Sequence, residues 1–132
     1  MSQLGKFRDS LALYRRHGWR LARALMTTET LAELRGGEEG AGSETRFEGV
    51  EPQESDLDAM WLSRASAGGR EAWELRLIAD SPYALFELFE PDETEEDRED
   101  VRREMEARMR ETMNAERGTI NAEVKAESQR PE

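Results

Sequence analysis

Apolar residues near the start of the chain recur with the period of an α-helix. Their 3-4-3 spacing places them on one helical face, and Leu13 and Trp19 fall outside it. Arg15 and Arg16 followed by His17-Gly18 are also typical of a helix C-terminus, where cations favour the last turn and glycine follows it. We therefore expect a helix to at least His17 and leave residues 19–26 open between helix and strand. The positions of the apolar face are Leu4, Phe7, Leu11, Tyr14, Gly18, Leu21 and Leu25.

A different pattern, alternation with a period of two, surrounds the pair Gly68-Gly69. Alternating runs on both sides of Gly-Gly indicate a β-hairpin, because a two-residue turn needs positive φ at both central residues. We expect its strands over residues 59–66 and 71–79.

The two-residue turn also predicts a register, with Ala67 opposite Arg70. In this register Trp61 lies opposite Arg76, an aromatic–guanidinium pair on a half-polar face of the hairpin. The other face is then the core face, made of Met60, Leu62, Arg64, Trp73, Leu75 and Leu77.

The segment after the hairpin has two interpretations. Ser81-Pro82 has the composition of a helix start, whereas the aromatic run over residues 83–90 favours a third antiparallel strand. A lone hairpin is only marginally stable, so we choose the strand.

The last periodic segment predicts a long helix from Glu93 to about Glu116. Asp92 and Glu95 form a candidate capping pair, carboxylates crowd the first turn, and Gly118 follows the end. An earlier helical turn is predicted from Thr30 to Gly36. The apolar stripe of the long helix is Val101, Met105, Met109 and Met113.

These elements predict an α+β fold with an N-terminal helix, a small antiparallel sheet and a long C-terminal helix. We expect one domain over residues 1–117, interrupted by an acidic flexible loop at residues 36–57. Residues 118–132 have the scattered composition of a disordered tail.

Charge is distributed unevenly around a formal net charge of −11. Residues 1–35 hold seven Lys and Arg against three Asp and Glu, a net +4, and residues 36–132 hold twelve against 27, a net −15. A basic helix therefore precedes an acidic body.

The residue types exclude several chemistries. The chain has no Cys, so thiol nucleophiles, thiolate zinc sites and disulfides are excluded. The only histidine, His17, lies among arginines, without a nucleophile-elbow motif. The glycine-rich residues 36–45 lack the Lys of a phosphate-binding loop. We expect no catalytic site, cofactor or metal, and interpret as a solvated acidic loop the cluster of Glu51, Glu54, Asp56 and Asp58.

Candidate partner surfaces remain. The basic helix offers Arg15, Arg16 and Trp19 for nucleic acid or anionic lipid, but the overall negative charge disfavours both partners. We instead expect its arginines to pair with acids of the same chain, in the acidic loop and at the start of the last helix. The other candidate residues are Trp61 and Arg76 on the hairpin and Met105, Met109 and Met113 on the last helix.

We expect a non-catalytic, cytoplasmic protein-interaction module that binds another protein, in particular a basic one, or a second copy of itself. In size, charge and order of elements it resembles adaptors, secretion chaperones and immunity proteins, an analogy at the level of the fold alone. The alternatives are nucleic-acid or membrane docking through the basic helix, and a ligand-binding domain or enzyme with a pocket between helix and sheet.

Overall fold

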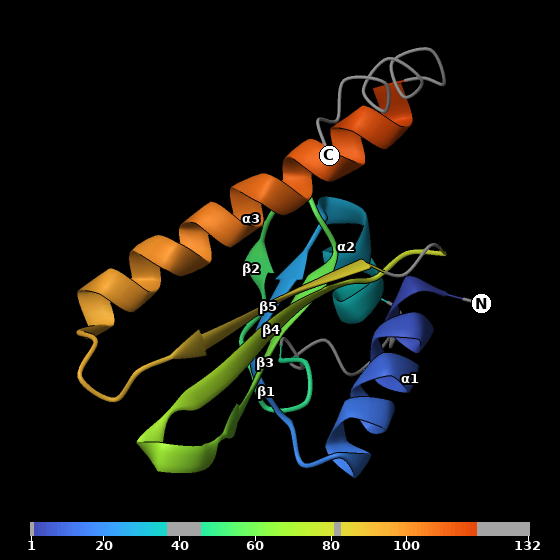
Figure 1. Cartoon of the computed structure of the whole chain (residues 1–132). Helices are drawn as coiled ribbons and strands as arrows, with labels where there is room; N and C mark the ends of the chain where they lie inside the picture. The colour runs from blue at the N-terminus through green and yellow to red at the C-terminus, as the bar shows by residue number, and fades with distance from the viewer. Residues whose placement is uncertain (1, 37–45, 81–82, 119–132) are drawn as a thin grey trace. The chain divides into compact units, whose positions relative to one another are not determined.

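A computed structural model of the chain describes residues 2–36, 46–80 and 83–118. It divides into two compact units, with the boundary between Glu93 and Thr94. The first unit contains the sheet and two helices, and the second contains one long helix, α3 (Figure 1). Residues 37–45 of the expected loop and 119–132 of the expected tail lie outside the described residues.

The first helix, α1, spans Gln3–Arg16. The Ser2 hydroxyl caps it by accepting from the backbone N–H of Gly5 at 3.0 Å. His17 is the C-terminal cap, and Gly18 follows with φ +87°, a conformation that favours glycine. Gly18 therefore ends the helix, and the segment after it is a strand, β1 (Arg20–Met26).

The second helix, α2, spans Thr28–Gly36. It begins earlier than predicted, because the capping residue is Thr27 rather than Thr30. The Thr27 hydroxyl accepts from the backbone N–H of Thr30 at 3.3 Å. Gly36 ends the helix as predicted.

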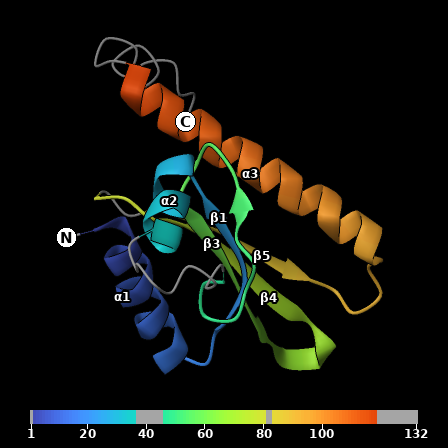
Figure 2. The ribbon, with the colours of Figure 1, turned by 180° about the vertical axis from the view of Figure 1, so that it is seen from behind.

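The sheet has five strands in the order β2-β1-β3-β4-β5 (Figure 2). Besides β1, these are β2 (Gln53–Glu54), β3 (Ala59–Ala65), β4 (Glu71–Leu77) and β5 (Tyr83–Phe89). β1 and β2 are parallel and the other neighbours are antiparallel. The predicted α+β class is confirmed, and so is the third antiparallel strand that we expected after the hairpin. The sheet is mixed and larger than predicted, because β1 and β2 extend it beyond the hairpin.

The hairpin turn is one residue longer than predicted. The backbone N–H of Ser66 donates to the Arg70 carbonyl at 2.9 Å, and a short 3₁₀ turn over Ala67–Gly69 lies between them. Gly68 and Gly69 both have positive φ, +71° and +79°, as expected for this pair. The three-residue turn shifts the pairing by one residue relative to a two-residue turn.

This shift corrects the predicted faces. Trp61 lies opposite Leu75, and Arg76 lies opposite Met60, so Trp61 and Arg76 are on opposite faces of the sheet. The predicted core face was wrong for the same reason: Leu62 now faces Glu74. Met60 and Leu62 share one face of the hairpin with Glu74 and Arg76, whereas Trp61 and Leu75 share the other.

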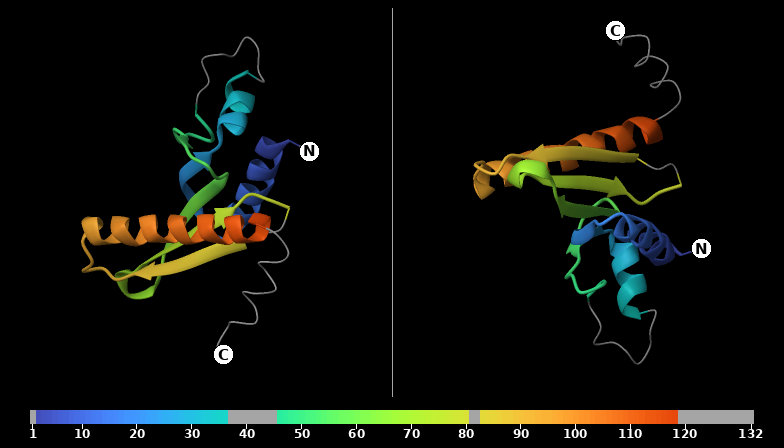
Figure 3. Two further views of the ribbon diagram at one scale, coloured as in Figure 1. Left: turned by 90° about the horizontal axis from the view of Figure 1, so that it is seen from above. Right: turned by 60° about the horizontal axis from the view of Figure 1, so that its bottom comes forward.

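Both α1 and α2 cover one face of the sheet (Figure 3). Phe7 of α1 meets the buried Phe47 edge-on, with ring centroids 5.5 Å apart. On the other face, Trp73 lies edge-on to Trp61 and Phe89. The core under the helices consists of Leu4, Phe7, Leu11, Tyr14, Ala24, Met26, Leu31, Leu34, Phe47, Met60, Leu62 and Ile78.

The separate helix α3 spans Glu95–Gly118. It is capped by the Thr94 hydroxyl, which accepts from the backbone N–H of Asp97 at 3.1 Å, rather than by Asp92. Two (i,i+4) ion pairs, Glu104–Arg108 and Glu106–Arg110, are present at 4.0 and 3.8 Å, and Arg103 pairs with Asp100 at 3.0 Å.

Asp58, at the entrance to β3, connects both helices to the sheet. Its carboxylate accepts from the Gln3 side-chain amide at 3.0 Å, the Thr27 backbone N–H at 2.9 Å and the Thr30 hydroxyl at 2.9 Å. The same Gln3 amide donates to the Ile78 carbonyl at 2.9 Å. Asp58 is therefore an anchor for α1 and α2, not part of a solvated acidic loop.

We expect Asp58→Ala to lower the free energy of unfolding by about 2–3 kcal/mol, because three donors lose a charged acceptor. Denaturant unfolding followed by circular dichroism measures this. The matched control is Glu54→Ala, which removes the same charge from an exposed residue of β2 and should change stability by less than about 0.5 kcal/mol. Equal effects of the two substitutions would contradict the anchoring role.

Candidate functional site

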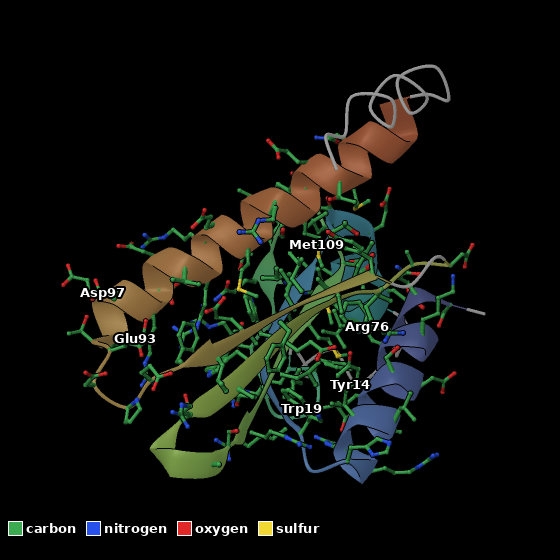
Figure 4. The ribbon with its side chains drawn as sticks, in the orientation of Figure 1. Tyr14, Trp19, Arg76, Glu93, Asp97 and Met109 are labelled. Atoms are coloured by element: carbon green, nitrogen blue, oxygen red, sulfur yellow. The ribbon has the colours of Figure 1, made fainter. Side chains whose placement is uncertain are left out.

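The most distinctive surface of the first unit is a hollow beside the C-terminal half of α1. It has a volume of about 220 Å³ and is lined by Leu13, Tyr14, His17, Trp19 and Arg76. Figure 4 shows Tyr14, Trp19 and Arg76 together between α1 and the strands. We call these five residues the Tyr14 hollow.

A second hollow, of about 250 Å³, lies beside the N-terminal half of α1. It is polar: Lys6 and Asp80 line it and form an ion pair at 2.8 Å. The hydrogen bond and charge of Lys6 hold the pKa of Asp80 below its usual value. Arg76 lines this hollow as well, and so separates an apolar hollow from a polar one.

The hydroxyl of Tyr14 is fixed by a hydrogen bond from α1 to the sheet. It donates to the Glu74 carboxylate on β4 at 2.5 Å. Burial, and then this hydrogen bond, raise the pKa of Tyr14 to about 12. The phenol therefore stays protonated at neutral pH, as a positioned donor and a poor general base.

Two arginines lie over the aromatic rings of the hollow. The guanidinium carbon of Arg76 is 5.8 Å from the centroid of the Tyr14 ring, and that of Arg64 is 5.0 Å from the centroid of Trp19. Tyr14 and Trp19 meet edge-on, with centroids 5.9 Å apart. Arg64 also donates to the His17 carbonyl, so it secures the end of α1 and the position of Trp19 together.

One exposed apolar side chain lines the Tyr14 hollow, and two more lie on the edge strand β5. Among the described residues, the large hydrophobic side chains that are exposed are Leu13 (44%), Phe86 (57%) and Leu88 (38%). Leu13 lines the hollow. Phe86 lies directly opposite Glu74, the acceptor of the Tyr14 hydrogen bond, and Leu88 lies opposite Ala72.

Facing residues on adjacent strands point to the same side of the sheet. Phe86 and Leu88 therefore lie on the same face as Glu74 and its partner Tyr14. We call the Tyr14 hollow together with Phe86 and Leu88 the α1–β5 surface.

The residues proposed from the sequence are distributed over several places. Trp19 and Arg76 belong to the α1–β5 surface, whereas Trp61 is buried on the opposite face of the sheet. Arg15 and Arg16 are exposed on the last turn of α1. Met105, Met109 and Met113 lie four residues apart on one side of α3, in the second unit.

The expected pairing of the α1 cations is present in part: Glu48 of the acidic loop is one partner, and Asp80, which we did not expect, is another. Arg8 and Arg15 both reach Glu48, at 3.7 and 3.4 Å, and Lys6 reaches Asp80. These exposed pairs are individually weak. They nevertheless reduce the positive potential that the helix presents to a polyanion.

Sequence reasoning missed four residues of this region: Tyr14, Leu13, Phe86 and Leu88. Tyr14 was assigned to the core stripe, and its partner Glu74 is 60 residues away. Two signals were available. Leu13 falls outside the apolar stripe of α1, and the alternation of YALFELF places Phe86 and Leu88 on one face of a strand.

The described residues contain no group of three or more histidine, aspartate or glutamate side chains arranged to bind a metal ion. No helix among them is long and apolar enough to cross a membrane. Both hollows are smaller than the roughly 300–1,000 Å³ typical of small-molecule sites.

The chain was compared with protein-family models, curated proteins and solved structures. No family model matches it, and no curated protein or solved structure matches it significantly.

The environment of Tyr14 predicts a pH dependence of stability. Because its pKa is raised from 10.0 to about 12, the folded state holds this proton more tightly than the unfolded state. The resulting stabilisation is complete below about pH 10 and is lost as the pH rises through 12.

We therefore expect the free energy of unfolding to fall more steeply in the unsubstituted protein than in Tyr14→Phe over this range. The expected difference is about 1–2 kcal/mol. Urea unfolding at closely spaced pH values measures it. Because both proteins share every other titrating group, parallel curves would contradict this environment for Tyr14.

Proposed function

We propose that this chain is a small, non-catalytic protein-interaction module that binds another protein through the α1–β5 surface. One observation carries the proposal. The exposed large apolar side chains of the described residues lie on one face of the first unit. Leu13 lines the Tyr14 hollow with a tryptophan, a tyrosine and an arginine, and Phe86 and Leu88 are on the same face of the sheet. Tyr, Trp and Arg are enriched in the residues that dominate binding energy at protein interfaces.

The fixed side chains of the α1–β5 surface support binding rather than catalysis. Tyr14 is held by its hydrogen bond to Glu74 and by the Arg76 guanidinium over its ring, so little of its conformational entropy remains to be lost when a partner binds. The raised pKa of Tyr14 makes it a hydrogen-bond donor in place of a base. The hollow, of about 220 Å³, has room for an anchoring side chain beside Leu13, and Phe86 lies on the same face of the sheet.

The net charge of −11 supports a basic partner. Long-range attraction raises the rate of encounter with a cationic protein and opposes association with a polyanion. An adaptor, chaperone or immunity-type role is consistent with these features, and a cytoplasmic location is part of the proposal.

The test is quantitative capture from a lysate of the source cells with a tagged protein, nuclease-treated, at low and moderate salt. We expect Leu13→Glu to reduce the captured partner by about tenfold or more, because it places a charge at the rim of the hollow. The matched control is Ala12→Glu, which adds the same charge at the neighbouring exposed residue of α1, outside the hollow. It should capture the partner like the unsubstituted protein.

Two outcomes would overturn the proposal. One is equal capture by all three proteins. The other is recovery only without nuclease and only at low salt, which would indicate nucleic-acid docking through the basic helix. In that case Arg15→Glu with Arg16→Glu would abolish recovery, whereas Leu13→Glu would not.

A further inference from the structure

The two edges of the sheet differ in how they are protected against pairing with another strand. The β2 edge is two residues long, contains Glu54 and follows Pro52, and short, charged edges resist pairing. The β5 edge is seven residues long, and in the first unit β5 pairs only with β4. An edge strand of this length presents a row of backbone groups to a further strand.

The composition of β5 favours such pairing. Its sequence, YALFELF, holds three aromatic residues, two leucines and a single charge, Glu87. Lysine and proline, the residues that commonly block edge strands, are absent from it. Phe86 and Leu88 are exposed on its α1 side.

The strand is complementary to a second copy of itself. When two copies of β5 run antiparallel about a two-fold axis at Phe86, Phe86 faces Phe86 of the other copy. Ala84 then faces Leu88, Leu85 faces Glu87, and Tyr83 faces Phe89. Small residues meet large ones, aromatic residues meet aromatic residues, and no like charges face each other.

The neighbouring two-fold registers are less suitable. A two-fold axis at Glu87 would place two carboxylates opposite each other, which is destabilising. A two-fold axis at Leu85 would place Phe86 opposite Ala84 and leave Leu88 without a facing residue within β5. The Phe86 register pairs all seven residues of the strand.

We propose that two copies of this chain pair through β5, antiparallel and centred on Phe86, to form one continuous sheet. The interface is isologous, since the same residues contribute from both copies. The exposed apolar side chains of β5 and its self-complementary order are the observations that select a second copy as the occupant of this edge.

This pairing has a consequence for the α1–β5 surface. In a continuous antiparallel sheet, facing residues point to the same side, so both α1 helices cover the same face. The two copies of the surface then lie next to each other, with the two Phe86 side chains between them. This consequence rests on the proposed function, whereas the dimer itself does not.

The charge of the protein predicts how the dimer responds to salt. Each copy carries a net charge of −11, and the resulting repulsion is screened by added salt. Association should therefore strengthen with ionic strength. Binding to nucleic acid would weaken instead.

The decisive experiment places opposite charges at residue 86. It measures dimerisation of the full chain by sedimentation and native mass spectrometry. We expect the unsubstituted protein to dimerise with increasing concentration, and Phe86→Lys and Phe86→Glu each to weaken the dimer about tenfold or more. Because residue 86 faces itself in the proposed register, a mixture of the two variants should associate more tightly than either alone. Circular dichroism checks that both variants fold.

Leu13→Glu is the matched control, because it also places a charge at an exposed apolar residue of the same face, away from the edge strand. It should dimerise normally while losing the captured partner, so failure of the dimer and failure of the proposed function are distinguishable. The inference is overturned if the unsubstituted protein is monomeric at all concentrations. It is also overturned if dimers persist in both Phe86 variants, or if the mixture of the two variants associates no more tightly than either variant alone.

Discussion

A single carboxylate holds the starts of both helices that cover the sheet. Asp58 accepts hydrogen bonds from Gln3 at the start of α1 and from Thr27 and Thr30 at the start of α2, and it directly precedes β3. The starts of α1, α2 and β3 therefore meet at the Asp58 carboxylate. This carboxylate is partly buried, so it needs these hydrogen-bond donors in place of water. With the N-terminus of α1 held there, its C-terminal half reaches β4, where Tyr14 meets Glu74.

The position of α1 explains why part of the same face stays open. Its buried residues pack with β1 and β3, whereas β5, at the edge of the sheet, keeps Phe86 and Leu88 exposed. A chain with few large apolar residues and a net charge of −11 gains little from exposing them unless something binds there. Both proposals follow from this open half of the face: a partner in the hollow, and a second copy at the edge.

Arginine has two distinct uses in this protein. On the outer side of α1, Arg8 and Arg15 pair with Glu48. Beside the hollow, Arg64 and Arg76 lie over Trp19 and Tyr14, where a planar guanidinium stacks on a ring and still donates hydrogen bonds. Three cations of α1 thus have acidic partners within the fold. The aromatic residues beside the hollow remain available for recognition.

Local patterns in the sequence determined which elements form. The helical spacing of apolar residues specified α1, Gly68-Gly69 specified a turn, and the aromatic run of YALFELF specified β5, because period and backbone conformation are properties of neighbouring residues. Tertiary structure alone decided the rest. Residues 20–26 became β1 through pairing with β3, and one added turn residue placed Trp61 and Arg76 on opposite faces. The Tyr14 hollow joins residues about 60 positions apart. Contacts between such distant residues depend on how the elements pack, and the local hydrophobic pattern does not specify that packing.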